Sequence, residues 1–356
     1  MGMLYTGMKV FHFKDKLDSL PRERAEILPP IHIRLKPTNV CNHRCRYCAY
    51  RAPDLQLGRD MSTRDQIPQE RMQELVRDLG DMGVKAVTFS GGGEPFCYPH
   101  LLETAQGLAE RGIALACLTN GSRLTGEVAS FFAHQATWLR ISLDGWDEQS
   151  YASYRGVEPG SFGRLLANME QFAAQGGGCL LGVSLIVDAD NAAHVYETAR
   201  RVREAGAHSI KISPCIISNS GAENNAYHLP VYDLVKEQTA RAQAELQGEG
   251  FEVYDAYHLL EERFDKPYHW CPYLQVLPVI GADLRVYSCQ DKAYNLDSGC
   301  LGSIQEQGFA QFWSQGKEKF FAIDPSRDCG HHCVANAKNK MVLEYLGADQ
   351  DHLGFV

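Results

Sequence analysis

The chain has 356 residues, 44% of them hydrophobic and 22% charged, which is enough for one large globular domain and a smaller one. Its formal net charge of −9 argues against nucleic acid as a main partner, because binding a phosphate backbone requires an excess of basic side chains. Charged residues interrupt positions 1–20 and no apolar run reaches membrane-spanning length, so we expect a cytoplasmic protein with no membrane partner.

Six short apolar runs predict buried β-strands, and the amphipathic stretches between them predict helices. The expected strands span residues 31–35, 84–89, 113–118, 138–143, 180–187 and 209–212. Parallel neighbours in a sheet need a crossover connection, which is usually a helix. The alternation therefore predicts an α/β fold, a partial (β/α)6 barrel whose ligands gather at the carboxyl ends of the strands.

The pattern changes after residue 255, where apolar runs at 276–280 and 284–287 predict a β-hairpin. We therefore expect four segments along the chain. They are an N-terminal extension (1–30), the barrel (31–220), a linking helical region (221–265) and a small cysteine-bearing domain of a hairpin plus a helix (266–356).

Three cysteines, Cys41, Cys45 and Cys48, follow the first expected strand within one tight loop. Twelve cysteines in a chain without an export signal favour metal binding or catalysis over a disulfide framework. Three thiolates are one ligand short of a closed zinc site or a fully ligated iron–sulfur cluster. The triplet therefore indicates a cluster with one iron open to a ligand, and the alternative is a zinc knuckle completed by His43 or a distant cysteine.

The triplet, with Tyr47 immediately before its last cysteine, resembles the signature of the radical S-adenosylmethionine (SAM) superfamily. The resemblance implies that Cys41, Cys45 and Cys48 hold a 4Fe-4S cluster whose open iron chelates the amino and carboxylate groups of SAM. It also implies that an external donor such as flavodoxin or ferredoxin supplies an electron that cleaves SAM. The product of that cleavage is a 5'-deoxyadenosyl radical, which abstracts hydrogen from unactivated carbon.

Other segments are similar to the SAM-binding segments of this superfamily. The residues that we expect to bind SAM are Tyr47, Gly92, Gly93, Glu94, Ser142, Asp144 and Arg155. Glycines allow close approach of the backbone, and the resemblance implies that Glu94 contacts the amino group of SAM. Ser142 and Asp144 alternate to one face and reach the ribose hydroxyls or the substrate, while Arg155 offers a planar fork for a carboxylate. The alternative for each is a turn or a helix cap.

Four further cysteines lie near the C-terminus, and four thiols would fill a second cluster completely. They are Cys271, Cys289, Cys329 and Cys333. The arrangement resembles the auxiliary-cluster extension called SPASM and, with four suitable cysteines, its shorter form, twitch. One departure is Leu284, which stands where the longer pattern has glycine, so we expect the turn at Gly281 instead. Cys300 is an alternative ligand, and a zinc ribbon is the alternative to a cluster.

Three residues outside these groups are candidates for catalysis. Cys97 and Cys215 follow expected strands and would donate hydrogen to a substrate radical, and Lys211 is a polar residue in an apolar run that we expect to face the barrel lumen. Packing as a small apolar group is the alternative for both thiols, and Lys211 could instead extend its ammonium group to solvent. Cys117 and Cys179 fit a packing role better still.

These features predict an oxidoreductase that abstracts hydrogen from a polar substrate, with a second cluster that accepts an electron. We expect a two-electron oxidation, as by a dehydrogenase, of a carbohydrate, aminocyclitol or nucleotide-sugar. The alternatives are a radical SAM peptide maturase or epimerase and, from another class, a zinc-stabilised binding protein without radical chemistry.

Overall fold

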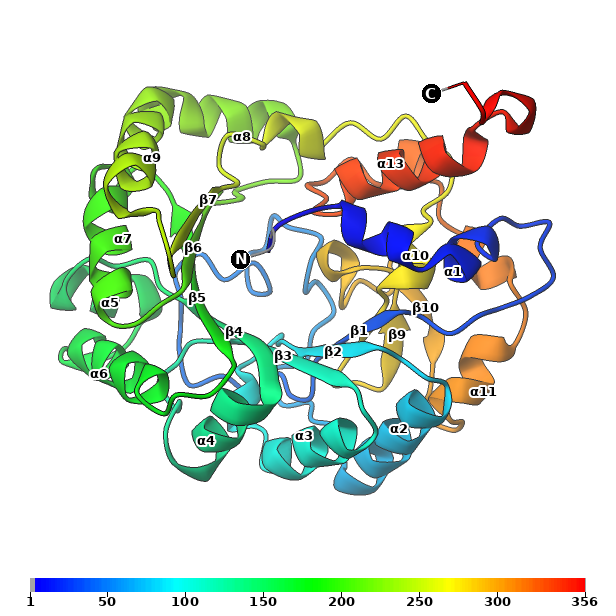
Figure 1. Ribbon diagram of the computed structural model, residues 1–356, viewed down its shortest axis with the longest axis horizontal. Helices are drawn as coiled ribbons and strands as arrows, with labels where there is room; N and C mark the ends of the chain where they lie inside the picture. The colour runs from blue at the N-terminus through cyan, green and yellow to red at the C-terminus, as the bar shows by residue number, and fades with distance from the viewer. Residues whose placement is uncertain (1–3, 356) are drawn as a thin grey trace.

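The computed structural model describes residues 4–355, and within them ten strands form a single curved sheet with helices on its outer side (Figure 1). The strands are β1 (His32–Leu35), β2 (Ala86–Phe89), β3 (Ala114–Thr119), β4 (Ala136–Ser142), β5 (Leu180–Val187), β6 (Ser209–Pro214), β7 (Glu252–Asp255), β8 (Val279–Ile280), β9 (Arg285–Tyr287) and β10 (Cys300–Ser303). Their order across the sheet is β10-β9-β8-β1-β2-β3-β4-β5-β6-β7.

Most helices cover the convex face of this sheet. Their bounds are α1 (Lys14–Asp18), α2 (Gln69–Asp81), α3 (Leu101–Glu110), α4 (Gly126–Gln135), α5 (Glu148–Arg155), α6 (Ser161–Ala173), α7 (Val195–Glu204), α8 (Gly221–His228), α9 (Tyr232–Leu246), α10 (Tyr273–Val276), α11 (Phe309–Ser314), α12 (Pro325–Asp328) and α13 (Asn336–Gly347). In α2, Met72, Leu75 and Leu79 are buried at helical spacing, so one apolar stripe of the helix faces the core. No helix of the described chain is long and apolar enough to span a membrane.

Strands β1 to β7 are parallel to their neighbours, and this confirms the predicted α/β fold with a parallel partial barrel. Side chains alternate between the two faces of each strand. Ile33 and Leu35 point outward into the helix layer, where both are fully buried. The register pairs Ser184 with Lys211, and Lys211 lines a cavity inside the barrel, as expected for a lumen-facing position.

The structure differs from the expected segments in two places. The region 221–265 contains α8 and α9 but also β7, which pairs with β6 and continues the barrel sheet. Its sequence, Glu-Val-Tyr-Asp, offers Val253 as the only aliphatic side chain for the core, so no apolar run marks it. The region 266–356 is not a separate sheet either, because β8 pairs in parallel with β1.

The expected hairpin is present, since β8 and β9 are antiparallel with Ile280 opposite Val286. The turn begins at Gly281, as expected, but its left-handed position is occupied by Leu284 and not by a glycine. Leu284 itself adopts the left-handed conformation, with φ of 58°, and its amide donates to the Gly281 carbonyl at 3.1 Å. Gly281 is needed for space, because a Cβ there would overlap the carboxylate of Asp283.

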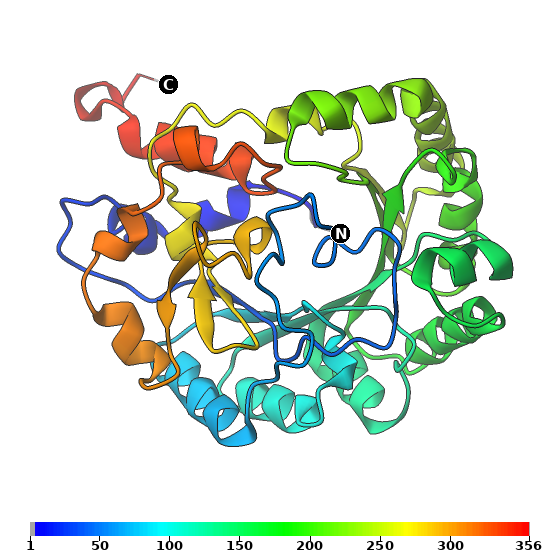
Figure 2. The same cartoon turned by 180° about the vertical axis from the view of Figure 1, so that it is seen from behind.

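The barrel has two distinct ends. The loops that follow the parallel strands gather at the carboxyl end, whereas the N-terminal segment runs across the opposite opening, as both views show (Figures 1 and 2). There Tyr5 stacks on Tyr254 of β7 with ring centroids 4.3 Å apart, and its hydroxyl accepts from Arg140 of β4 at 3.0 Å. The loops at the carboxyl end are therefore the ones placed to form a ligand site, as is usual for parallel sheets.

Candidate active site

The long loop between β1 and α2 carries Cys41, Cys45 and Cys48, whose side chains are all partly exposed. The amide of Arg44 donates to the carbonyl of Arg155 at 2.9 Å and so fixes this loop to the end of α5. Burial raises the pKa of the Cys41 thiol to about 11. A thiolate at this position therefore needs a cation or a metal centre to stabilise it.

Arg155 joins this loop to the end of β4. Its Nη1 lies 3.6 Å from the Sγ of Cys45, and its guanidinium forms a buried ion pair with Asp144. The Oδ1 of Asp144 accepts from the amide of Ile186 at 2.7 Å. Burial raises the pKa of Asp144 to about 6, although Arg155 opposes the shift. The sequence marked Arg155 and Asp144 as separate SAM contacts and gave no sign that they pair with each other.

Glu94 connects the ends of β2 and β3. Its carboxylate accepts from the hydroxyl of Thr119 at 2.5 Å, the amide of Asn120 at 2.6 Å and the amide of Phe96 at 3.1 Å. Burial raises the pKa of Glu94, and the three donors counteract part of that shift. Two carboxylate oxygens have about four acceptor positions, so one position is left for an ammonium group.

The glycines before Glu94 let its loop pack closely on the cysteine loop. A Cβ on Gly93 would overlap the backbone of Asn39 and Val40, and a Cβ on Gly92 would overlap the side chains of Asn39 and Met61. The amide of Glu94 also donates to the carbonyl of Val40 at 2.9 Å. Close approach of two chain segments therefore explains these glycines without a ligand.

Several buried polar atoms near these loops have no hydrogen-bond partner among the described residues. They include His43 Nδ1, Tyr47 OH and Ser90 Oγ. Tyr47 also lies under Arg155, with the guanidinium carbon 5.8 Å from its ring centroid. Ser142 ends β4 opposite Ser184, at the same end of the barrel. The three thiols fit the ligands of a cluster, and the unpaired polar atoms and Glu94 fit contacts to a polar ligand such as SAM bound to it.

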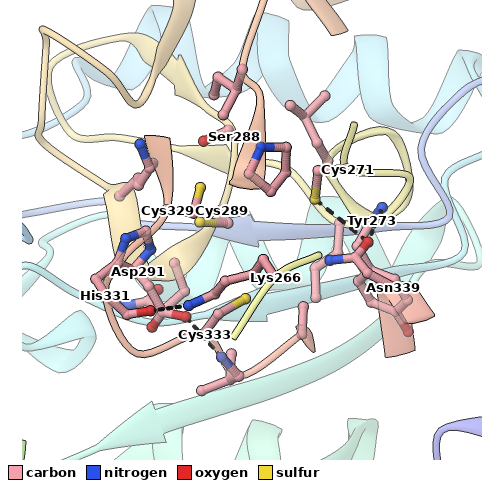
Figure 3. A pocket seen from close by; sticks show the side chains of 18 of the residues that line it. Lys266, Cys271, Tyr273, Ser288, Cys289, Asp291, Cys329, His331, Cys333 and Asn339 are labelled. Atoms are coloured by element: carbon pink, nitrogen blue, oxygen red, sulfur yellow. Dashed lines mark hydrogen bonds between the residues drawn. The ribbon is translucent and has the colours of Figure 1, made fainter. Parts of the chain in front are cut away.

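Four other cysteines surround one cavity of about 60 Å³ between β8, β9 and the C-terminal segments (Figure 3). They are Cys271, Cys289, Cys329 and Cys333. Val279, Leu277 and Ile323 supply apolar walls. Four thiols around one enclosed, largely apolar space fit a cluster in which every iron has a protein ligand.

Charged side chains line the same cavity. Lys266 and Lys292 supply ammonium groups, and Lys266 donates to the carbonyls of Phe264, at 2.9 Å, and His331. Burial raises the pKa of the Cys271 thiol to about 11, and this thiol donates to Asn339 at 3.5 Å. Four thiolates would add negative charge, which the two lysines are placed to offset.

The structure separates Cys300 from this group. Cys300 lies on β10 opposite Tyr287 of β9, does not line the cysteine cavity, and its thiol donates to the Gly302 carbonyl at 3.6 Å. It packs against the cluster of Val279, Tyr287 and Tyr294. The ligand set with Cys289 is therefore the one that the geometry brings together.

The three candidate catalytic residues do not meet at one point. Cys97 ends a short 3-10 helix after Glu94 and is partly exposed. Cys215 follows β6 and is buried, which raises its pKa to about 12. Lys211 lies within the lumen, where burial and then Arg140 lower its pKa to about 7.

The sequence did not predict one network of ion pairs and hydrogen bonds at the carboxyl end of the barrel. Arg46 of the cysteine loop pairs with Asp188 at 2.7 Å, and the hydroxyl of Tyr154 donates to Asp188 at 2.5 Å. Asp188 directly follows β5, so the rule that functional side chains follow parallel strands would have identified it.

Within residues 4–355, no three or more His, Cys, Asp or Glu side chains converge closely enough to hold one metal ion.

A parallel partial barrel with three loop cysteines after its first strand defines the class of iron–sulfur proteins that bind SAM at the carboxyl end of the sheet. The radical SAM superfamily matches residues 35–202, which include this loop and strands β2 to β5. This segment belongs to the radical SAM superfamily, and the chain accordingly binds a 4Fe-4S cluster and SAM.

Similar proteins have diverse activities. An S-adenosylmethionine-dependent nucleotide dehydratase of Lacinutrix mariniflava is 30% identical over 112 residues, which are 31% of this chain and 22% of that protein. The Fe-coproporphyrin III synthase of Methanosarcina barkeri is 24% identical over 88% of this chain and 77% of its own length. Streptococcus suis SuiB, solved with its precursor peptide SuiA, has the same fold at 16% identity, with a TM-score of 0.60 over 88% of this chain and 71% of SuiB.

Proposed function

We propose that this chain is a two-cluster radical SAM enzyme that oxidises a polar small molecule by two electrons. The observation that carries the proposal is the gathering of Cys271, Cys289, Cys329 and Cys333 around one cavity, apart from the SAM-binding loop. A second cluster with four protein ligands has no open iron for SAM, so its use is electron transfer. In this proposal residues 31–220 form the SAM-binding barrel, 221–265 add β7 to its sheet and connect it to the last segment, and 266–356 hold the second cluster.

When bound, SAM and the first cluster supply a 5'-deoxyadenosyl radical that takes a hydrogen atom from substrate carbon. Cys41, Cys45 and Cys48 hold that cluster, and Arg155 orients Cys45 while Asp144 orients Arg155. This arrangement keeps a cation beside a sulfur ligand and leaves the lumen for the substrate.

Other residues of the carboxyl end bind and orient SAM. Glu94 accepts from its amino group through the remaining acceptor position, and Gly92 and Gly93 keep the Glu94 loop tightly packed on the cysteine loop. The hydroxyls of Tyr47 and Ser142 supply further polar contacts at this end.

Oxidation of an alcohol also requires removal of a proton. Lys211 Nζ is suited to take it, because burial and neighbouring cations lower the pKa of this lysine to about 7. Cys271, Cys289, Cys329 and Cys333 would hold a second cluster that would provide an acceptor for the remaining electron, and an external flavodoxin or ferredoxin would supply the electron that starts the reaction.

The substrate is a carbohydrate, aminocyclitol or nucleotide-sugar in this proposal. By their names, one of the similar proteins dehydrates a nucleotide and another forms Fe-coproporphyrin III, and both compounds are small molecules. The alternative is peptide maturation, which SuiB suggests by its complex with a precursor peptide. Epimerisation is the alternative outcome, with Cys97 or Cys215 as hydrogen donor.

Metal analysis and a SAM cleavage assay test the proposal. Anaerobically purified chain should contain about eight irons and about eight sulfides, as two four-iron clusters require. With dithionite and SAM it should release 5'-deoxyadenosine, and the rate should rise when the right metabolite or peptide is added. Deuterium uptake from solvent into an unoxidised product would instead establish an epimerase.

The matched control replaces Cys41, Cys45 and Cys48 with alanine. This variant should retain about four irons and produce no 5'-deoxyadenosine. Zinc without iron in the wild-type chain would contradict the proposal and favour a zinc-stabilised binding protein.

A further inference from the structure

A cavity of about 570 Å³ lies inside the barrel. It occupies the half of the lumen toward the amino ends of the strands, opposite the SAM-binding loops. Its walls include residues of β1, β2, β4, β5, β6 and β7, of the N-terminal segment and of α13. Tyr5 of the N-terminal segment closes it, through the contacts with Arg140 and with Ser209, whose Oγ is 3.2 Å from the Tyr5 hydroxyl.

Every lysine or arginine in this lining lacks an acidic counterpart there, and there are six of them. They are Lys9, Arg34, Arg140, Lys211, Arg263 and Lys338. No aspartate or glutamate of the described chain lines the cavity, although the whole protein carries a net charge of −9. None of the six forms an ion pair with a described residue. Asp291, whose charge acts on Arg34, lines the cysteine cavity and not this one.

Two of these cations have unused donors. The Nε atoms of Arg34 and Arg140 are buried and have no hydrogen-bond partner among the described residues. Burying a guanidinium without an acceptor costs free energy, and an anion in the cavity would satisfy both groups. Burial, and after it the positive charges of Arg140, Arg263, Arg34 and Lys338, lower the pKa of Lys211.

We infer that this basic cavity binds a small molecule with phosphate or carboxylate groups, which is the substrate of the proposed oxidation. The identification of the bound molecule as the substrate rests on the proposed function, whereas the anion site itself rests on the cavity alone. Arg34 and Arg140 face the anionic groups, and Lys338 adds charge at the rim.

The position of the cavity fits this role. Arg140 of β4 precedes Asp144, which lies just past the end of that strand, by four positions, and this corresponds to about 13 Å of extended chain. A molecule held by its anionic end at Arg140 would therefore present carbon to the SAM-binding end only if it were of about nucleotide size. Between these two levels, Ser184 lies opposite Ser142, and both have small side chains that leave room for it.

The cavity also adjoins the second cysteine group. Arg34, Tyr273, Leu277 and Val334 line both this cavity and the cavity of the four thiols. A ligand in the basic cavity is thus one layer of side chains away from the proposed second cluster. A separation of one layer of side chains suits transfer of an electron from the bound molecule to that cluster.

Calorimetric titration of the anaerobically reconstituted protein tests the anion site. The probes are inorganic pyrophosphate and GTP for phosphate groups, coproporphyrin III for carboxylate groups, and guanosine as the uncharged control. One or both anionic classes should bind at a single site, and the class that binds identifies the anionic group. Arg140→Gln should weaken that binding at least tenfold, and Lys338→Gln, on a different element, should weaken it in the same direction.

Lys236→Gln is the matched control, because Lys236 is exposed on α9 and does not line the cavity. It should bind the probe as tightly as the wild type does. Guanosine binding as tightly as GTP, unchanged binding in both cavity variants, or no binding of either anionic class would overturn the inference. Titration needs no SAM cleavage, so a chain that binds anions but releases no 5'-deoxyadenosine would refute the proposed function alone.

Discussion

Arg155 lies against Cys45, with Nη1 3.6 Å from the cysteine Sγ, while its guanidinium is held by the buried carboxylate of Asp144. The pair joins the end of β4 to the cysteine loop, two segments about a hundred residues apart in the chain. It therefore couples the stability of the barrel to the geometry of the first cluster.

Replacing Arg155 should show this coupling. Arg155→Met leaves the carboxylate of Asp144 buried without its partner, and breaking a buried pair in this way costs about 3–5 kcal/mol. Urea unfolding should show the loss, and adding Asp144→Asn should restore part of it. Arg46→Met is the control, because Arg46 is partly exposed and its pairs with Asp188 and Asp190 contribute about 0–1 kcal/mol. Equal losses in the two single variants would contradict this account.

Cys289 and Cys300 provide a matched test of the second cluster. Cys289 lines the cysteine cavity and Cys300 does not, although both are partly exposed thiols of the same region. Cys289→Ala should lower the iron content from about eight to about four, and Cys300→Ala should leave it unchanged. Iron and sulfide analysis measures both. Loss of iron in the Cys300 variant alone would assign the ligand to β10 instead.

The features that could be predicted from sequence are those with a short-range pattern. Alternating apolar strands and amphipathic helices predict the parallel barrel. Cys41, Cys45 and Cys48 form a short motif within one loop, so their common site can also be predicted. Cys271, Cys289, Cys329 and Cys333 are distant in sequence, and only a resemblance grouped them before the structure placed them around one cavity.

The remaining features depend on contacts between distant residues or on a local exception. The basic cavity combines residues of six strands, the N-terminal segment and α13, and no linear motif connects Arg34 with Lys338. Leu284 is a local exception. A left-handed leucine costs about 1–2 kcal/mol, so residue preference alone predicts a glycine at the left-handed position of the turn. The hydrogen bond to the Gly281 carbonyl and the partial burial of Leu284 stabilise the leucine in that conformation.

Gly93 should be intolerant of a side chain. A Cβ there would overlap the backbone of Asn39 and Val40, and backbone cannot rotate away as a side chain can. Gly93→Ala should therefore cost about 1–3 kcal/mol of stability and reduce the iron bound by the adjacent cysteine loop. Gly178→Ala is the control, because nothing lies within 4 Å of its Cβ position, and it should leave both urea unfolding and iron content close to wild type. Wild-type iron and stability in Gly93→Ala would show that the two loops can separate without loss.

Lys16 should make stability depend on pH above neutrality. Its ammonium group is buried beneath Trp313 and donates to the carbonyl of Leu28 at 2.6 Å, and burial followed by repulsion from Lys317 lowers its pKa from 10.5 to about 7. Between these two values the unfolded chain binds the proton and the folded chain does not. The free energy of unfolding should therefore rise with pH from about 7 to about 10, by at most about 1.4 kcal/mol per pH unit from this group.

Lys16→Met should remove this contribution, so the difference in stability between the wild type and the variant should shift in favour of the wild type as pH rises from 7.0 to 8.5. Urea unfolding of the reduced, cluster-free protein at both pH values measures it. Lys14→Met is the control, because Lys14 is exposed on the same short helix, and its pH slope should match that of the wild type. A wild-type slope in Lys16→Met would mean that the buried ammonium group keeps its proton in the folded chain, held by the Leu28 carbonyl and the face of Trp313.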